Sequence, residues 1–343
     1  MTTVTKKKNL TQKVIAEALG VSIATVSLAL RGSPLIQSST RERVQKYVRE
    51  AGYIQNRAAT ALRTGRTRII GVGFHDIVHP FFAEMLATME AQLADRGDAI
   101  FINNHNDSMK NQRRFVTTLM EHGADGLILS PALGTTEADL EAFRQSDSAV
   151  VLIVRSILDT SLDYVINNDP ECMNLATTHL LKLGHKNILM LGGKVGTTTA
   201  DGRYQGFVSA MTDAGYNPGR EAWIDGPSKR LESHFAIKSL WDSGAPRPTA
   251  IACFNDLVAF GAMSALSELG LEVGRDVAVV GIDDTDEAQV SSPPLTTVTN
   301  NAQVIGREAV DVLFNRLTNP KAPPIQKKLV PYISIRESCG SQH

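Results

Sequence analysis

Residues 11–32 read TQKVIAEALGVSIATVSLALRG, and they determine the architecture expected for the first part of the chain. They contain two short helical patterns. In the first, apolar residues recur at helical spacing on one face, at Val14, Ile15, Ala18 and Leu19. Thr11 can cap the start of this helix, and Gly20 can adopt the left-handed conformation that ends one.

The second helix begins after Ser22, which can cap it, and places Val26 and Leu30 on its inner face. Because only two residues separate the helices, the chain must turn sharply between them. Two short helices joined by a tight turn are typical of a helix-turn-helix, whose second helix enters the DNA major groove. A third helix is predicted at residues 39–51.

The charge of the chain is unevenly distributed. Residues 1–66 contain 12 basic and three acidic residues, a net charge of +9, whereas the remainder contains 23 basic and 33 acidic residues, a net charge of −10. A basic head on an acidic body indicates that the head binds a polyanion. A basic helical hairpin without a DNA-binding role is the alternative interpretation.

Candidate DNA contacts lie on the outward face of the second helix. Thr25 and Ser27 can hydrogen-bond to phosphates or base edges, and apolar side chains can contact thymine methyl groups. No Arg, Gln or Asn stands on this face, so direct readout is expected to depend on apolar fit. The outward positions are Ser22, Ile23, Ala24, Thr25, Ser27 and Leu28.

From residue 67 the chain alternates between strand-like and helical patterns. Strands are predicted at 69–74, 99–103, 126–130 and 150–154 and, in a second series, at 165–167, 188–191, 250–254 and 277–282. Helices are predicted at 80–96, 110–122, 136–145, 171–183, 202–214, 232–242, 255–269 and 303–317. This alternation predicts parallel sheets covered by helices, and two series predict two lobes with a ligand cleft at the carboxyl ends of the strands.

Several catalytic motifs are present only in part. The segment from His75 to His79 has the spacing of a zinc-binding HExxH motif, but it runs into Pro80 and is expected to form a loop, so no metal site is predicted. GGKVGTTT, at 192–199, lacks the residue order of a phosphate-binding loop, and no GxSxG elbow appears. Neither enzymatic activity nor a cofactor is therefore expected.

Cysteine usage and hydropathy indicate the compartment. Cys172, Cys253 and Cys339 are too far apart for a zinc-site or disulfide pattern, which favours a reducing cytosol. The longest apolar runs, such as 149–154, are far shorter than the roughly 20 residues that a membrane span needs. The first residues lack the apolar stretch of a secretory signal. A cytoplasmic location without a membrane partner is expected.

The same residues resemble a known family. Residues 10–32, together with TRERVQKYVREAGYIQNRAATALRTGRT at 40–67, are similar to the LacI/GalR family of bacterial regulators. The resemblance continues in family order through nearly the whole chain. It includes RIIGVGF (68–74), HPFFAEML (79–86), GADGLILSP (123–131), PTAIACFNDLVAFGAM (248–263), VAVVGIDDT (277–285) and ISIRES (333–338).

The resemblance implies a small all-α helix-turn-helix head, a hinge helix and an α/β body of two lobes with parallel sheets, like a periplasmic sugar-binding protein. The corresponding ranges are a DNA-binding domain at 1–55, a hinge and linker at 56–66, and an effector-binding and dimerisation domain at 67–343. In that body the N-lobe comprises about 67–168 and 300–330, and the C-lobe about 169–299 and 331–343. The family binds palindromic operators as dimers, so double-stranded DNA, an effector and a second copy of the chain are the expected partners.

The resemblance also assigns DNA contacts. The family's base-reading positions correspond to Ile23, Ala24 and Leu28. In a hinge helix expected at 56–63, Leu62 matches an apolar wedge that enters the minor groove, and Ala59 matches the small residue one turn earlier. The predicted DNA-binding set is completed by Asn56 and Thr11.

Ligand contacts follow from the same resemblance, at Phe81, Phe82, Thr197, Arg203, Asn255 and Asp283, with Arg155 and Asp256 as neighbours. Carboxylate, amide and guanidinium groups can share hydroxyl protons, and an aromatic ring can stack on a sugar. Purine-binding relatives have Arg where Thr197 stands, so a sugar, sugar acid or polyol is the expected effector. The alternative is that Asn255 only caps a helix and Asp283 a turn.

The leading prediction is a sequence-specific transcription regulator, most consistent with a repressor, associated with the nucleoid in the bacterial cytoplasm. Two other classes share part of the pattern. A solute-binding protein of a transporter would need an export signal and would leave residues 1–66 without a role. An α/β enzyme would need a phosphate loop or a catalytic constellation. Retention on DNA that falls steeply with salt separates the regulator from both.

Overall fold

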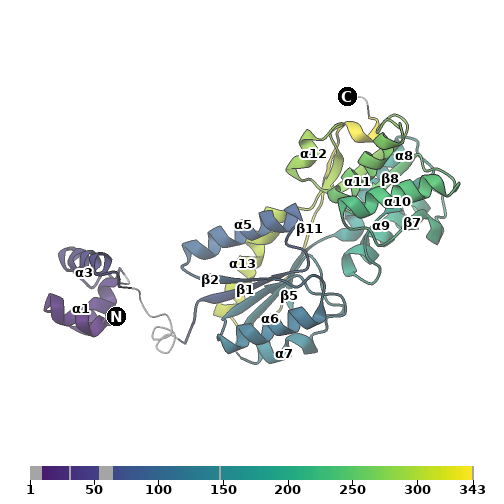
Figure 1. Ribbon diagram of the computed structural model, residues 1–343. Helices are drawn as coiled ribbons and strands as arrows, with labels where there is room; N and C mark the ends of the chain where they lie inside the picture. Colours follow the sequence, from purple (N-terminus) through teal and green to yellow (C-terminus); the bar gives the residue numbers. More distant parts are fainter. Residues whose placement is uncertain (1–9, 31, 54–64, 147, 342–343) are drawn as a thin grey trace, which may run out of the picture. The chain divides into compact units, whose positions relative to one another are not determined.

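The computed structural model describes residues 10–30, 32–53, 65–146 and 148–341. The chain divides into two compact units, residues 1–67 and residues 68–343 (Figure 1). We call the first unit the head and the second unit the body, and we describe each by itself.

Three helices form the head: α1 (Gln12–Leu19), α2 (Ile23–Leu30) and α3 (Ser38–Glu50). The Thr11 hydroxyl caps α1 by accepting a hydrogen bond from the Val14 backbone N–H at 3.3 Å. Gly20 ends α1 with a φ of 66°, a conformation that glycine adopts without strain. The axes of α1 and α2 differ by 106°, and the predicted helix-turn-helix is confirmed.

A small core joins the three helices. Ile15, Val26 and Val44, one from each helix, are completely buried. The predicted inner face of α1 is partly wrong, because Val14 is 40% exposed and Ala18 is also exposed. The other two helices pack against the side of α1 that carries residues 15, 16 and 19.

Within the described ranges, no single helix is long and apolar enough to cross a membrane. The pair α1 and α2 passes that test only when the two bent helices are taken together, by length and composition alone.

The N-lobe of the body is a six-stranded sheet between two layers of helices. Its strands are β1 (Ile69–Phe74), β2 (Ala99–Asn104), β3 (Gly126–Leu129), β4 (Ala149–Ile153), β5 (Asp163–Asn167) and β11 (Gln326–Leu329). Its helices are α5 (Pro80–Asp95), α6 (Met109–Glu121), α7 (Ala138–Arg144) and α13 (Ala302–Thr318). The order β11-β5-β4-β3-β1-β2 is parallel throughout. α5 and α13 cover one face, and α6 and α7 the other (Figure 1).

The C-lobe repeats this arrangement. Its strands are β6 (Ile188–Leu191), β7 (Trp223–Ile224), β8 (Ala250–Cys253), β9 (Ala278–Asp283), β10 (Thr296–Thr299) and β12 (Ile333–Ser334). Its helices are α8 (Asp169–Lys182), α9 (Thr198–Asp213), α10 (Arg230–Asp242), α11 (Asp256–Glu268) and α12 (Asp286–Val290), with 3₁₀ turns η1 (Arg220–Ala222) and η2 (Glu337–Cys339). The order is β12-β10-β9-β8-β6-β7, and only the β10–β12 pair is antiparallel.

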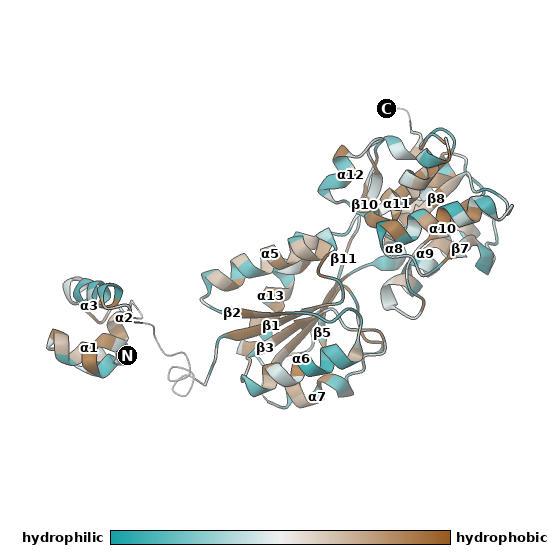
Figure 2. Cartoon of the chain, viewed as in Figure 1, coloured by the Kyte–Doolittle hydropathy of each residue, from teal (hydrophilic) through white to brown (hydrophobic). Residues whose placement is uncertain are grey.

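Both sheets are apolar because both of their faces are covered. Every residue of β3, β4, β6, β8 and β9 is buried. Figure 2 shows the N-lobe strands in brown between helices that carry both teal and brown residues. The strand-like runs and helical patterns of the sequence are therefore confirmed as two parallel α/β lobes.

The chain passes between the lobes three times. It leaves the N-lobe between β5 and α8, returns between β10 and α13, and leaves again between β11 and β12. Each lobe is thus completed by a segment that is distant in sequence. Four strands and one α-helix of the body were not predicted from the sequence: β7, β10, β11, β12 and the short α12.

Candidate functional site

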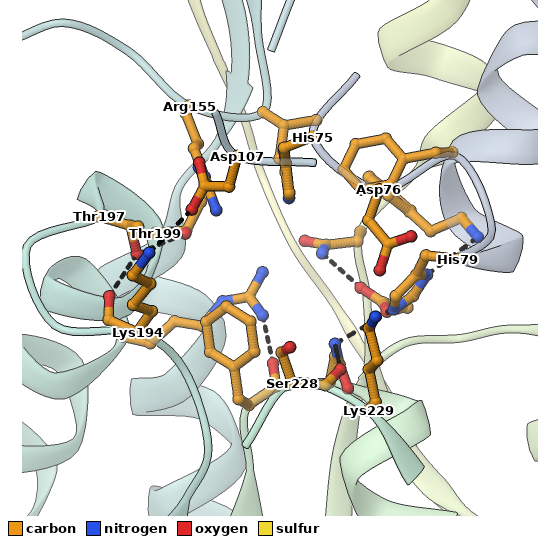
Figure 3. A pocket seen from close by; sticks show the side chains of 18 of the residues that line it. His75, Asp76, His79, Asp107, Arg155, Lys194, Thr197, Thr199, Ser228 and Lys229 are labelled. Atoms are coloured by element: carbon orange, nitrogen blue, oxygen red, sulfur yellow. Dashed lines mark hydrogen bonds and ion pairs between the residues drawn. The ribbon is translucent and has the colours of Figure 1, made fainter. Parts of the chain in front are cut away.

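A cavity of about 310 Å³ lies between the two lobes. Its walls are the turns that follow the strands. Asp107 follows β2 and Arg155 follows β4 in the N-lobe, while Asn255 follows β8 and Asp283 ends β9 in the C-lobe. Figure 3 shows Asp107 and Arg155 on one side of this cavity and Ser228 and Lys229 on the other. The cleft predicted at the carboxyl ends of the strands is present in the structure.

Arg203, on α9, presents a buried guanidinium to the cavity; only 3% of the residue is exposed. Its Nε donates to Asp169 Oδ1 at 2.8 Å, and its Nη1 donates to the Phe254 carbonyl. The guanidinium carbon lies 4.5 Å from the centre of the Phe254 ring. Burial raises the pKa of Asp169 to about 6 despite the nearby arginine, so this carboxyl is ionised at neutral pH. These contacts hold the guanidinium in one orientation.

Asp283 is the buried acceptor of the site. Its backbone has a φ of 139°, in the region that side chains other than glycine seldom adopt. Its Oδ1 accepts a hydrogen bond from Asn300 Nδ2 at 2.7 Å, whereas within the described part of the chain its buried Oδ2 has no hydrogen-bond partner and lies 3.4 Å from His79 Nε2. Burial raises the pKa of this carboxyl above its ordinary value. A ligand hydroxyl can donate a hydrogen bond to Oδ2 and so offset the desolvation of this buried oxygen.

His79 connects this acceptor to the other lobe. It caps α5 by accepting from the Phe81 N–H at 3.3 Å, and its Nε2 lies 3.1 Å from Asn255 Nδ2 and 3.4 Å from Asp283 Oδ2. Burial lowers the pKa of His79 to about 4, so the ring is neutral near pH 7. Asn255 also caps α11, because its Oδ1 accepts from the Val258 N–H at 2.8 Å. The capping role predicted as the alternative thus coexists with a place in the cavity wall.

A charged group forms the opposite wall. Arg155 Nη1 donates to Asp107 Oδ1 at 2.6 Å, and Lys194 Nζ, from the C-lobe, lies 3.4 Å from Asp107 Oδ2 (Figure 3). Burial opposes ionisation of Asp107, but the Arg155 charge and a hydrogen bond from the Leu133 backbone lower its pKa to about 2. Asp107 is therefore ionised throughout the physiological range.

The structure brings most of the predicted ligand contacts together. Seven of them line the cavity: Phe81, Phe82, Arg155, Thr197, Arg203, Asn255 and Asp283. Asp256 is not part of the lining. It is completely buried beneath the site, where its carboxylate accepts hydrogen bonds from Thr297 Oγ1 at 2.6 Å and from Thr285 at 2.9 Å and 3.0 Å. Its geometry is that of a support for the turn after β9.

Three of the predicted ligand contacts also stabilise the local structure. The Thr197 hydroxyl caps α9 by accepting from the Ala200 N–H at 3.3 Å. The rings of Phe81 and Phe82 meet edge to face at 5.3 Å and are almost fully buried. They can offer ring edges to a ligand, and they position His79 beside them.

The other residues that line the cavity were not predicted from the sequence as ligand contacts. They are His75, Asp76, His79, Asn106, Asp107, Lys194, Thr199, Ser228, Lys229, Glu232, Phe254 and Asn300, together with Val154 and Gly226. Their common signal is position, since many directly follow a strand. Both histidines of the HExxH-like segment belong to this set. His75 Nδ1 lies 2.9 Å from Ser130 Oγ, and no group of three metal-binding side chains occurs in the described residues.

The predicted DNA-reading face lies at the start of α2. Ser22 and Ala24 are exposed, Ile23 is 50% exposed, and Thr25, Ser27 and Leu28 are half-buried. The Ser22 hydroxyl accepts from the Thr25 N–H at 3.0 Å and so caps the helix. Asn56, Ala59 and Leu62 lie outside the described residues.

Comparison with known proteins matches both units. The model of the lacI family of bacterial regulatory proteins matches residues 11–56, and a periplasmic binding protein-like domain matches residues 177–339. The ribose operon repressor of Haemophilus influenzae is 31% identical over 96% of this chain and 99% of its own length. The repressor PurR of Vibrio vulnificus is 29% identical over 96% and 98%.

The fold is shared with a solved regulator. The lac repressor dimer bound to operator and the anti-inducer ONPF superposes with a TM-score of 0.86 and 25% identity, covering 97% of this chain and all of that one.

Proposed function

The chain belongs to the LacI family of bacterial regulatory proteins, and from this premise we propose that it is a transcriptional repressor controlled by a small polyhydroxyl effector. The observation that carries the proposal is the polar cavity between the lobes, in a chain that also has a helix-turn-helix head. The head would bind a two-fold symmetric operator in the cytoplasm, and the body would bind the effector.

The exposed start of α2 supports a direct role in base readout. Ile23 projects into solvent without contributing to the head's buried core, so a thymine methyl group is a fitting partner. Thr11, Ser22, Ala24, Thr25, Ser27 and Leu28 would contact the backbone or bases around it. At the hinge, Asn56, Ala59 and Leu62 complete the proposed interface.

The donors and acceptors of the cavity favour a sugar, sugar acid or polyol. Asp283 offers a buried acceptor, Arg203 a fixed donor and Arg155 a second guanidinium. A cavity wall with both hydrogen-bond donors and acceptors suits adjacent ligand hydroxyl groups, because each hydroxyl can both donate and accept a hydrogen bond. A cavity of about 310 Å³ also has room for a purine base, and the similarity to PurR makes purines the necessary comparison.

A homodimer is supported by an apolar patch on the C-lobe. Leu231 and Phe235 on α10 are 66% and 59% exposed, and Val290 at the end of α12 is 81% exposed. An ion pair between Arg230 and Glu287 at 2.7 Å joins α10 to α12, the two helices that carry these side chains. Exposed apolar patches of this kind mark association sites, and we assign a second copy of the chain as the occupant, as in the lac repressor dimer.

The test is to incubate the purified chain with fragmented genomic DNA of its source and to sequence the bound fragments. A few fragments sharing a two-fold symmetric site would support the proposal, and their neighbouring genes would narrow the effector. Binding is then repeated with aldoses, sugar acids, polyols and purine bases. Recovery of random fragments under every ligand condition would contradict sequence-specific repression. A response to purines alone would overturn the polyhydroxyl assignment.

A further inference from the structure

The sulfur of Cys339 lies among polar groups, far from the cavity. Cys339 ends η2, and its Sγ is 3.2 Å from His179 Nε2 on α8, 3.1 Å from Thr296 Oγ1 on β10 and 3.2 Å from Ser341 Oγ. The Arg336 carbonyl, at 3.3 Å, is the acceptor available to a thiol proton. Three potential donors therefore surround one sulfur, an arrangement that stabilises a thiolate.

His179 is the most important of these donors. The hydroxyls of Thr296 and Ser341 can instead donate to the Arg336 carbonyl, at 2.9 Å and 3.2 Å. The described partner of His179 Nε2 is the sulfur, to which this nitrogen donates in the tautomer that carries the proton on Nε2. The neighbouring guanidinium of Arg336 points away, to Asp284 at 2.7 Å.

The three cysteines differ in the hydrogen bonds of their thiols rather than in their burial. Cys172 and Cys339 belong to one buried apolar cluster of the C-lobe, and Cys253 belongs to the other. Among the described residues, the hydrogen-bond partner of the Cys172 thiol is Asn300 Oδ1, at 3.8 Å. Burial raises the pKa of both thiols. For Cys339 burial acts in the same direction, but the hydrogen bonds from His179, Ser341 and Thr296 outweigh it and lower its pKa to about 6.

We propose that Cys339 and His179 form a thiolate–imidazole pair and that Cys339 is a site of oxidative modification by hydroperoxides. The thiolate attacks the terminal oxygen of the hydroperoxide, so that a sulfur–oxygen bond forms while the oxygen–oxygen bond breaks. Sulfur loses two electrons and becomes a sulfenic acid. The hydroperoxide gains them and leaves as an alkoxide or hydroxide, which takes a proton from water.

Burial restricts access to this sulfur, since only 1% of Cys339 is exposed. The proposal therefore includes a local opening of the turn η2, which would let the oxidant reach the sulfur. An added oxygen has no room among contacts of 3.1–3.3 Å. Oxidation is therefore expected to loosen the turn and the contact with Thr296, at the start of β10.

The first experiment measures ionisation directly and needs no access to the sulfur. Thiolate ultraviolet absorbance is titrated in the native full chain and in Cys339→Ser, and the difference is plotted against pH. A midpoint near pH 6 is expected. A midpoint at or above the ordinary cysteine value of about 8.5 would overturn the proposal.

A histidine variant tests the pairing. His179→Asn should raise that midpoint by more than one pH unit, whereas His185→Asn is the matched control. His185 lies in the same lobe but bonds Thr249 at 3.1 Å, so the midpoint should not move. If His179→Asn does not fold, the difference titration of the unmodified chain still decides the ionisation.

The second experiment measures reactivity. The native chain is treated with limiting hydrogen peroxide and a sulfenic-acid trap, and the three cysteine peptides are quantified by mass spectrometry. Labelling of Cys339 should exceed that of Cys172 and Cys253 by about tenfold or more, because they lack thiolate at neutral pH. Equal labelling of the three, or no labelling of Cys339, would overturn its assignment as the modification site.

Discussion

His79 Nε2 lies 3.4 Å from Asp283 Oδ2, although the two residues belong to different lobes. Both are almost completely buried, and Asn255 lies beside them at 3.1 Å from the same ring nitrogen. Burial keeps His79 neutral and raises the pKa of Asp283. The contact between the lobes therefore depends on polar groups that a ligand or a proton can engage.

Asp283→Asn tests the ligand site without removing volume. The substitution keeps a hydrogen-bond partner for Asn300. It replaces a carboxylate oxygen by an amide oxygen, which is a weaker acceptor, or by an amide NH2 group, which is a donor. Effector affinity should fall by about 10- to 100-fold, the range of a hydrogen bond to a charged group. Calorimetric titration measures this effect. Operator affinity without effector should not change; equal loss of both would indicate a structural defect instead.

His79→Asn tests the pH dependence of folding. The folded-state pKa of His79, about 4, lies below the unfolded value of about 6.5. The unfolded chain therefore binds the proton first, and stability is lost as pH falls from about 6.5 towards 4. Asparagine keeps a cap on α5 but does not titrate. Between about pH 6.5 and 4, urea unfolding should show that the free energy of unfolding of the wild type falls by about 1.4 kcal/mol per pH unit more than that of the variant. The same dependence of this free energy on pH in both proteins would contradict the prediction.

Arg203→Met should be strongly destabilising. It leaves Asp169 buried without its charged partner, and breaking a buried pair in this way costs about 3–5 kcal/mol. The comparison is Arg275→Met, since Arg275 pairs with Glu272 and Asp276 on the exposed surface. Denaturant unfolding should show a clearly lower free energy of unfolding for Arg203→Met and no resolved change for Arg275→Met.

Ile23→Ala and Ile15→Ala separate recognition from folding in the head. Ile23 is half-exposed, so its truncation should leave the head resistant to limited proteolysis while weakening operator binding about tenfold and leaving random DNA binding unaffected. Ile15 is completely buried, and its truncation should destabilise the head by about 2–5 kcal/mol. Loss of protease resistance in Ile23→Ala would assign that residue to the fold instead.

Phe235→Glu tests the dimer. A carboxylate in an apolar interface loses hydration without gaining a partner, so sedimentation should show a monomer at micromolar concentration. Leu158→Glu is the control, because Leu158 is 83% exposed but lies in the N-lobe, away from α10. Dimers that persist in Phe235→Glu would exclude this patch as the interface.

The sequence predicted the buried strands well and the marginal ones poorly. β1, with the run IIGVGF, and β6, with ILML, have the expected bounds, because strands covered on both faces must be apolar. β11 reads QKKL and is largely exposed at the edge of its sheet. Its position depends on pairing with β5 across about 160 residues, which local periodicity cannot reveal.

Some residues of the candidate site could also be predicted from the sequence, and others could not. Arg203 and Asp283 could be predicted through family motifs, and the structure places both in the cavity. Asp256 directly follows Asn255, yet its side chain turns inward to Thr285 and Thr297. His79 was predicted only as part of a loop, because its proximity to Asp283 arises from the approach of two lobes.

The three passages of the chain between the lobes also constrain how the protein is made. During translation the N-lobe lacks α13 and β11 until about residue 329, and the C-lobe lacks β12 until about residue 334. The head, residues 10–53, needs no later segment for its small core. A nascent chain can thus carry a folded helix-turn-helix while both lobes are still incomplete. Quality control on the ribosome must therefore protect two unfinished sheets at once, rather than one domain after another.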